Sequence, residues 1–164
     1  MLYFGLRPFI SLKYSQYLSS ETQQKFQPHL CLGPRGLPLE SRRRWGSKYL
    51  NNLHQATVLV QGTGTGWDIL SWAKLKPRKI IATDLFAFED SWQAITKYCY
   101  DHYRTAVEFR LASIDAMTFL DNNSVDLIAS DAVYEHCRHL PAVMQESYRI
   151  LKPGGCVYAS YGHL

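Results

Sequence analysis

The 164-residue sequence has few cysteines, no long apolar run and no compositional bias, and each absence excludes a class of protein. Its four cysteines lie far apart and form no CxxC pair, so neither zinc-ligand spacing nor the disulfide framework of a small secreted domain is present. No metal site is therefore expected. No apolar run approaches the roughly 18 residues that span a bilayer, and Arg7-Pro8 interrupts the N-terminal stretch where a signal peptide would need apolar residues. A cytoplasmic protein without a membrane partner is the default expectation.

Charge is modest, with a net value of +4, and the run Arg42-Arg43-Arg44 carries much of it. Such a run can attract nucleic acid or an acidic substrate. No stripe of basic residues extends it, so a solvated helix face is the better interpretation and a nucleic-acid partner is not expected. The hydrophobic content of 46% is that of an ordinary folded domain, and the length suits a single core.

Proline and glycine interrupt residues 1–54, which are expected to form an N-terminal extension of helix and loop that could close over a site as a lid. Within it, a helix is expected from about Glu40 to Leu53, with Trp45, Tyr49 and Leu53 on one face. An aromatic-rich segment of this kind can equally pack against a sheet.

In residues 55–164, short apolar runs alternate with segments of helical period. Such alternation requires right-handed crossovers, and it predicts an α/β fold with a Rossmann-like parallel sheet of about five strands and helices on both faces. Ligands of such sheets bind beyond the carboxyl ends of the strands, so the loops after Gln61, Asp84, Leu111 and Ser130 should surround one crevice. The expected strands are 56–61, 79–84, 105–111, 124–130 and 156–161, and the expected helices are 67–76, 88–103 and 140–151.

A glycine loop follows the first expected strand, with glycines at 62, 64 and 66. Glycine lets the backbone turn sharply and lets a ligand approach where a Cβ would clash. The dinucleotide fingerprint G-x-G-x-x-G needs its third glycine at 67, where Trp67 stands, so a nicotinamide-dependent oxidoreductase is disfavoured. Taken alone, the loop is explained equally well by a tight strand-to-helix turn.

Two acidic positions follow later strands. Asp84 closes the second strand, where an acid could accept hydrogen bonds from ribose hydroxyls. Asp115, followed by Ala116, comes after the third strand, where a carboxylate could reach an adenine amino group. Each acid taken alone is also explained as a cap or turn residue.

In combination, these segments resemble the class I S-adenosylmethionine-dependent methyltransferases, and in particular a methyltransferase type 11-like domain. The resemblance covers about residues 56–160, and the ordered series of segments is more specific than the loop alone. It implies that S-adenosylmethionine is the cofactor, with its methionine part at the glycine loop and its sulfonium near Ser130 and Asp131. The segments are 58–66, 82–85, 114–116, 124–136 and 149–155. The implied cofactor contacts are Gly62, Thr63, Gly64, Gly66, Asp84, Leu85, Asp115, Ala116 and Ser130.

Two departures from the family pattern bear on activity. Members usually carry an acid two places before the first glycine, where it helps to hold the ammonium group of the cofactor; here that residue is Val60. Weaker binding or a substitute contact is therefore expected. The family fold also adds two further strands, whereas this sequence stops at Leu164, so the core is expected to be short at its C-terminus. The fifth strand would then be an exposed edge through which copies could associate.

No catalytic residue is assigned. Tyr134, Glu135 and His136 follow the fourth strand, and His136 could take a proton near neutral pH. The alternative is that Glu135 and His136 only close a short helical turn. The leading hypothesis is a methyltransferase acting on a small-molecule acceptor, and the second is a truncated or degenerate, non-catalytic member that serves as a binding or interaction module.

Overall fold

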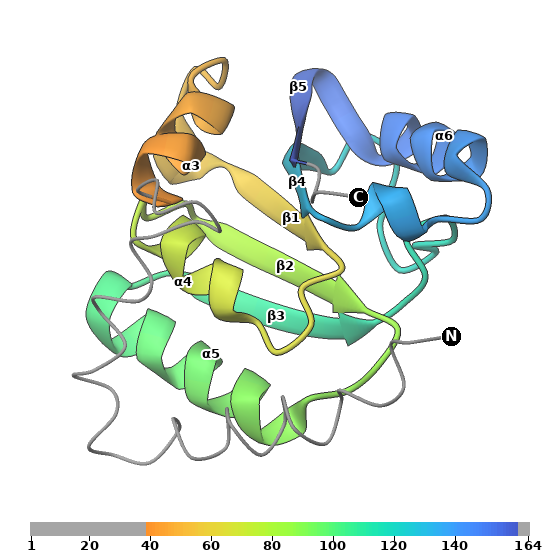
Figure 1. Cartoon of the computed structure of the whole chain (residues 1–164). Coiled ribbons are helices and arrows are strands. Elements are labelled where there is room, and N and C mark those ends of the chain that lie inside the picture. The colour runs from red at the N-terminus through yellow and green to blue at the C-terminus, as the bar shows by residue number, and fades with distance from the viewer. Residues whose placement is uncertain (1–38, 161–164) are drawn as a thin grey trace.

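A five-stranded parallel sheet forms the centre of the protein, as a computed structural model shows (Figure 1). The structure describes the backbone of residues 39–160 and the side chains from Arg43 onward. Every neighbouring pair of strands is parallel, in the order β3-β2-β1-β4-β5. The predicted Rossmann-like α/β architecture is confirmed. Most of the N-terminal extension and the last four residues lie outside the described part of the chain. The strands are β1 (Thr57–Gln61), β2 (Lys79–Asp84), β3 (Ala106–Leu111), β4 (Val125–Asp131) and β5 (Leu151–Ser160).

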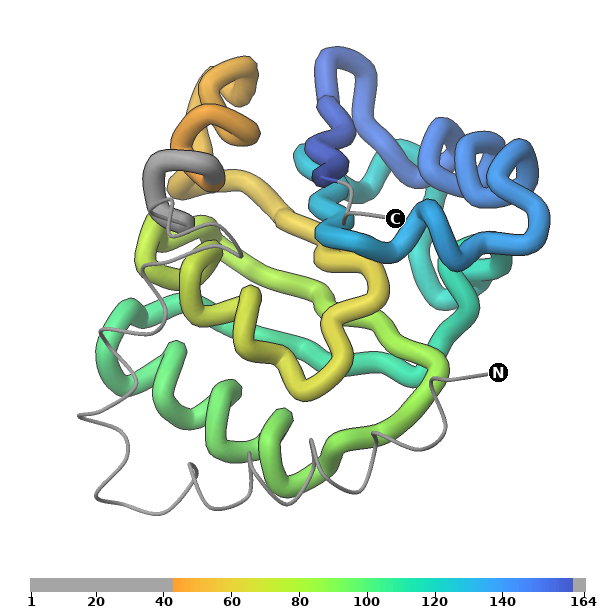
Figure 2. The backbone as a smooth tube through the Cα atoms, viewed as in Figure 1, coloured from red at the N-terminus to blue at the C-terminus, as the bar shows by residue number. Residues whose placement is uncertain are grey.

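Helices cover both faces of this sheet, as predicted (Figures 1 and 2). The first face is covered by α4 and α5, with α3 packed beside α4 and against β5. The second face is covered by α6 and by the connection between β3 and β4. Right-handed crossovers explain this division, because the chain runs outward from β1 in one direction and then in the other. The helices are α3 (Leu39–Ser47), η2 (Leu53–Gln55), α4 (Trp67–Ala73), α5 (Glu89–Tyr103), η3 (Tyr134–His136) and α6 (Leu140–Ile150).

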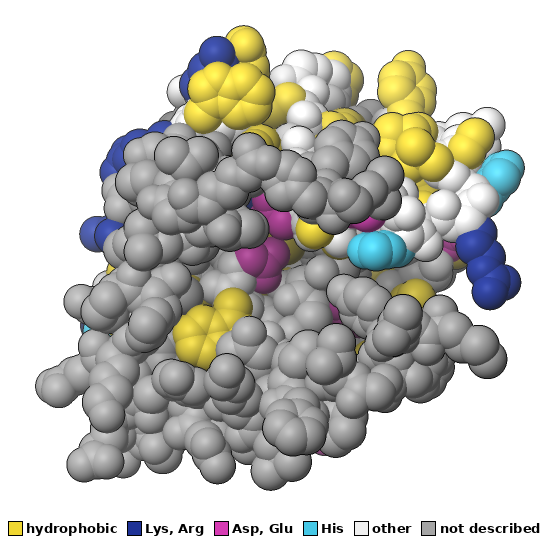
Figure 3. Space-filling model, in the orientation of Figure 1, with side chains coloured by type: hydrophobic (Ala, Val, Ile, Leu, Met, Phe, Trp, Pro, Cys, Tyr) yellow, Lys and Arg dark blue, Asp and Glu magenta, His cyan; other side chains and the backbone are white. Residues whose placement is uncertain are grey.

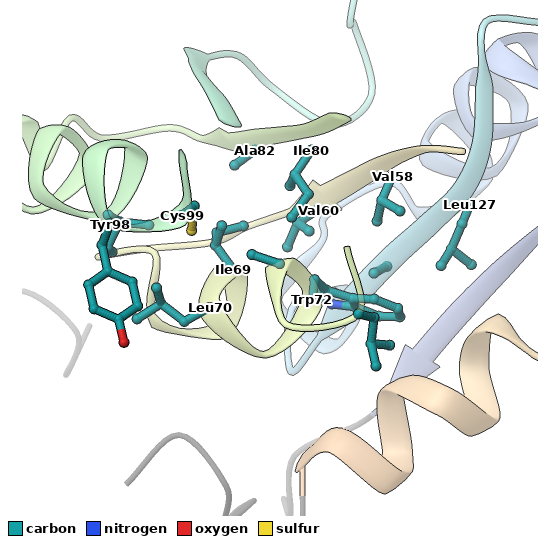
Figure 4. Packing of buried hydrophobic residues seen from close by; sticks show 14 of the residues in the cluster. Val58, Val60, Ile69, Leu70, Trp72, Ile80, Ala82, Tyr98, Cys99 and Leu127 are labelled. Carbon is teal, nitrogen blue, oxygen red and sulfur yellow. The ribbon is translucent and has the colours of Figure 1, made fainter. Parts of the chain in front are cut away.

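The strand period of two sorts the apolar residues into two cores. Alternate residues of the central strands, such as Val58 and Val60, face α4 and α5 (Figure 4). Their neighbour Leu59 faces α6 and meets Ile150 and Met117. All five of these side chains are fully buried. This is the pattern of a parallel sheet covered on both sides.

The helix expected over 40–53 is shorter and presents a different face. It ends at Ser47, and Trp45 and Tyr49 are 59% and 66% exposed. The buried face instead carries Arg43 and the small residues Gly46 and Ser47. A Cβ on Gly46 would come within 2.6 Å of the Tyr158 ring, so the missing side chain lets α3 lie directly on β5. Close contact between the α3 backbone and the Tyr158 ring, rather than burial of Trp45 and Tyr49, decides how this helix packs.

Strand β5 begins earlier than predicted. It starts at Leu151 rather than 156, and residues 152–155 form an irregularity before Cys156 pairs with Leu127. Lys152 donates to both carboxylate oxygens of Asp126 at 2.8 and 2.9 Å, which ties this irregular segment to β4. The helix expected over 140–151 ends at Ile150, and residues 152–155, expected to follow the helix as a break, fall inside the strand.

A test of the first core is Ile69→Ala. Ile69 is 0% exposed between α4 and the sheet, so truncation leaves a cavity and should lower the free energy of unfolding by about 2–5 kcal/mol. Leu140→Ala is the control, because Leu140 is 37% exposed and its truncation should cost less than about 1 kcal/mol. Urea denaturation of the three proteins measures both values, and equal losses would contradict the packing described.

Candidate functional site

The glycine loop connects β1 to α4, and each of its glycines has a positive φ: +65° at Gly62, +54° at Gly64 and +90° at Gly66. A Cβ on Gly62 would stand 2.5 Å from Val133, and one on Gly66 would stand 2.9 Å from Ile95. Packing alone therefore explains two of the glycines. A Cβ on Gly64 would meet nothing within 4 Å. At this position the backbone faces open space that another molecule could enter.

Helix α5 holds the loop in place. The indole N–H of Trp92 donates to the Gly64 carbonyl at 2.8 Å, and the Ser91 hydroxyl donates to the Thr65 carbonyl at 2.7 Å. The Trp92 ring stacks on Phe109, with 4.8 Å between centroids and 9° between planes. The loop is thereby fixed before any ligand arrives, which reduces the cost of binding.

Asp84 lies directly beside the loop. Its carboxylate accepts from the Gly64 N–H at 2.7 Å and from the Phe86 N–H at 3.0 Å. It does not cap α5, whose N-cap residue is Phe88. A carboxylate offers about four acceptor positions, so it can still accept from a ligand hydroxyl. The next residue, Leu85, is 65% exposed and provides apolar surface next to the carboxylate.

Asp115 and Ala116 lie in the connection after β3, and both are exposed. The Ser113 hydroxyl donates to Asp115, so the carboxylate is oriented within its own turn. Its negative charge also contributes to the raised pKa of Cys137, behind desolvation of that thiol. Asp115 therefore lies near Cys137 in the segment after β4. This agrees with the expectation that the loops after β3 and β4 come together.

The segment after β4 holds the side chains considered for proton transfer. The Tyr134 hydroxyl is buried and donates to Gln61 at 2.8 Å, so it supports the structure below the loop. Glu135 and His136 belong to the one-turn helix η3, as the alternative interpretation predicts. Ser130 is 1% exposed, and its hydroxyl is buried without a hydrogen-bond partner.

A buried arginine is the feature of this region that the sequence did not predict. Arg43 is 1% exposed, so the solvated-face interpretation is wrong for this member of the basic run. Its Nε donates to Ser71 at 2.9 Å, and its Nη2 lies 2.5 Å from Asp131 Oδ2. The guanidinium carbon lies 4.9 Å from the centre of the Trp72 ring. The small residues Gly46 and Ser47, one turn further along α3, were the only sequence signal for this buried face.

Asp68 completes the charged group around Arg43. It accepts a hydrogen bond from the Thr63 hydroxyl of the glycine loop at 2.8 Å. Desolvation raises the pKa of Asp68 to about 6, although Arg43 and the Thr63 hydrogen bond oppose the shift. The charge of Asp131 adds to the rise. Arg43 thus pairs with Asp131 at the end of β4 and interacts electrostatically with Asp68 beside the glycine loop. Acidic side chains are visible near the middle of this face in Figure 3.

A separate hollow of about 620 Å³ lies between α5 and β3, lined by residues from Trp92 to Tyr100 and from Ala106 to Phe109. None of the predicted cofactor residues lines it. The carboxyl ends of β1, β2 and β4, where the loops and charged groups converge, remain the better site.

The family model for the methyltransferase domain matches residues 59–159, which is more than half of the chain and includes the loops just described. The chain belongs to this methyltransferase family. The resemblance found in the sequence is thereby confirmed, and the family implies the use of S-adenosylmethionine.

Curated relatives agree with this assignment. The chain is 30% identical to the demethylmenaquinone methyltransferase of Chlorobaculum tepidum over 68% of its length and 43% of that protein. It is 31% identical to the malonyl-[acyl-carrier protein] O-methyltransferase of Yersinia pestis over 63% of its length and 35% of that protein. It thus spans less than half of each of these relatives.

Solved structures share the fold at low sequence identity. An arsenic(III) S-adenosylmethionine methyltransferase of Chlamydomonas reinhardtii matches 83% of this chain and 48% of its own, with a TM-score of 0.62 and 23% identity. A Haemonchus contortus phosphoethanolamine N-methyltransferase, solved with phosphoethanolamine and S-adenosylhomocysteine, matches 94% of this chain and 31% of its own, with a TM-score of 0.60 and 18% identity.

Among the described residues, no helix has the length and apolar character needed to cross a bilayer.

The raised pKa of Asp68 predicts a pH-dependent stability. The Asp68 carboxyl stays protonated to a higher pH in the folded chain than in the unfolded chain. Its contribution to the free energy of unfolding is therefore largest below about pH 4 and is lost as pH rises through 6. Between pH 5 and 7 the wild type should lose about 1 kcal/mol relative to Asp68→Asn, which does not titrate. Urea denaturation of both proteins across this range measures the difference. Parallel pH profiles would contradict the assigned pKa.

Proposed function

We propose that this chain binds S-adenosylmethionine at the carboxyl ends of β1, β2 and β4 and transfers its methyl group to a small-molecule acceptor. The observation that carries the proposal is the open space at Gly64, bounded by the Asp84 carboxylate. Side chains approach Gly62 and Gly66 too closely for a Cβ, whereas no atom lies within 4 Å of a Cβ placed on Gly64, so the space beside its backbone is open to a ligand. Membership of the methyltransferase family supports the nature of that ligand.

The residues present fit this cofactor along its length. Gly64 permits close approach to the backbone, and Asp84 has acceptor positions left for ribose hydroxyls. Leu85 offers apolar surface to the adenine, and Asp115 can accept from its amino group. We assign the remaining contacts to Gly62, Thr63, Gly66, Ala116 and Ser130, as the family resemblance implies.

S-adenosylmethionine supplies a methyl group that is already activated on a sulfonium. The protein therefore has mainly to orient the acceptor and exclude water. Ser130 and Asp131 end β4 at the place where the reacting atoms would lie, and the loop beside them is held rigidly by Trp92. Tyr134 is not assigned as a general base, because its hydroxyl already donates to the buried Gln61.

The distribution of positive charge supports a small-molecule acceptor over nucleic acid. Arg43 is buried in an ion pair with Asp131, so the basic run offers less positive surface to nucleic acid than the sequence suggests. The names of the relatives given above specify demethylmenaquinone, malonyl-[acyl-carrier protein], arsenic(III) or phosphoethanolamine as the acceptor. Three of these four acceptors are small molecules, and we infer a small-molecule acceptor for this chain.

The second candidate is a non-catalytic binding module. Val60 favours it, because this residue is fully buried in the first core and cannot contact an ammonium group. Association through the edge of β5 would suit such a role.

Calorimetric titration with S-adenosylmethionine and S-adenosylhomocysteine separates the candidates. We expect both molecules to bind the folded protein, because the loop and Asp84 are already in place. Circular dichroism confirms folding in the same sample. If neither binds at millimolar concentration, the proposal fails for this chain.

Gly64→Ala tests the open space directly. The added methyl group enters that space, and the positive φ costs about 1–2 kcal/mol for a residue with a Cβ. Gly154→Ala is a matched control, because Gly154 has a φ of +80° and also no neighbour within 4 Å, but lies in β5 away from the loop. Both variants should lose similar stability, whereas only Gly64→Ala should lower the affinity for S-adenosylhomocysteine, by tenfold or more. Equal affinities would exclude Gly64 from the site.

A further inference from the structure

The charged group of Arg43, Asp68 and Asp131 has properties that a structural ion pair does not explain. Arg43 is 1% exposed, yet its Nη1 has no hydrogen-bond partner. A buried donor without an acceptor costs roughly 1–3 kcal/mol, so native structures seldom keep one unless another molecule completes it. Asp131 pairs with the guanidinium, and Asp68 lies near enough to both groups to interact with them electrostatically. The group therefore retains both an unused donor and an excess of negative charge.

Its position connects this group to the glycine loop. Asp68 accepts from the Thr63 hydroxyl at 2.8 Å, and Thr63 lies between Gly62 and Gly64. Asp131 ends β4, next to β1 in the sheet. The family's acid would stand at residue 60, and Val60 faces the same side of the sheet as α4, the helix that carries Asp68. The missing negative charge is thus present on a neighbouring element.

We propose that Arg43, Asp68 and Asp131 form the subsite for the amino-acid end of the cofactor, in place of the acid that Val60 replaces. The carboxylates accept hydrogen bonds from the ammonium group, and Arg43 Nη1 donates to the carboxylate of the ligand. The inference rests on the proposed function. It explains why two acids surround one arginine, since a ligand with both an ammonium and a carboxylate needs both signs of charge.

The experiment compares two probes that differ only in the part assigned to this subsite. S-adenosylhomocysteine carries the amino-acid end, and 5′-methylthioadenosine lacks it but keeps the adenosine. Calorimetry gives the dissociation constant of each probe for wild type, Asp68→Asn and Arg43→Met. Asp126→Asn is the matched control, because it neutralises a carboxylate that pairs with Lys152 at the opposite end of β4.

We expect Asp68→Asn to weaken S-adenosylhomocysteine binding at least fivefold and to leave 5′-methylthioadenosine binding unchanged. Arg43→Met should show the same selectivity with a larger loss, and Asp126→Asn should change neither affinity. If Arg43→Met does not fold, Asp68→Asn decides alone, because asparagine keeps the shape of the side chain and can still accept from Thr63.

Two results would overturn the subsite. One is an unchanged affinity of Asp68→Asn for S-adenosylhomocysteine, and the other is an equal loss for both probes, which indicates a structural role only. Failure of the proposed function looks different, because the wild type would then bind neither probe.

Discussion

The sharp turn from β1 into α4 is the constraint on which the candidate site depends. Its glycines are set by what lies against them, since Val133 approaches Gly62 and Ile95 approaches Gly66 more closely than a Cβ allows. The loop therefore joins the segment after β4 to helix α5 while it carries the backbone around a free space at Gly64. One short segment thus satisfies both the packing of its neighbours and the access of a ligand. A substitution in this segment therefore affects both packing and ligand access.

Arg43 is the second organising feature, and it brings together parts of the chain that lie far apart in sequence. It links α3 to α4 through Ser71 and to β4 through Asp131. A buried ion pair is a weak source of stability, because desolvation offsets the Coulomb attraction. The presence of two carboxylates, one with a raised pKa, suits a group that serves binding more than stability.

Strand and helix periods were sufficient to predict the parallel sheet. The central strands β1, β2 and β4 are buried along most of their length and are therefore largely apolar, whereas β3 at the edge shows the strand period of two. The glycine spacing and Asp84 indicated the candidate site, since the carboxyl ends of parallel strands meet at one edge. The packing of α3 could not be predicted in the same way. Aromatic residues suggested the wrong face, and Tyr158, which makes Gly46 necessary, lies more than a hundred residues away.

The sequence by itself determined the fold class, the family and the loops that follow the carboxyl ends of the strands, because these follow from local periods and short motifs. Only the tertiary structure decided that Arg43 is buried, that it pairs with Asp131 near Asp68, and that Gly64 alone in its loop faces open space. The physical reason is that burial and charge pairing depend on neighbours distant in sequence. The glycine loop can be recognised in the sequence. The group of Arg43, Asp68 and Asp131 beside it, by contrast, forms only after α3 has packed against α4 and β5.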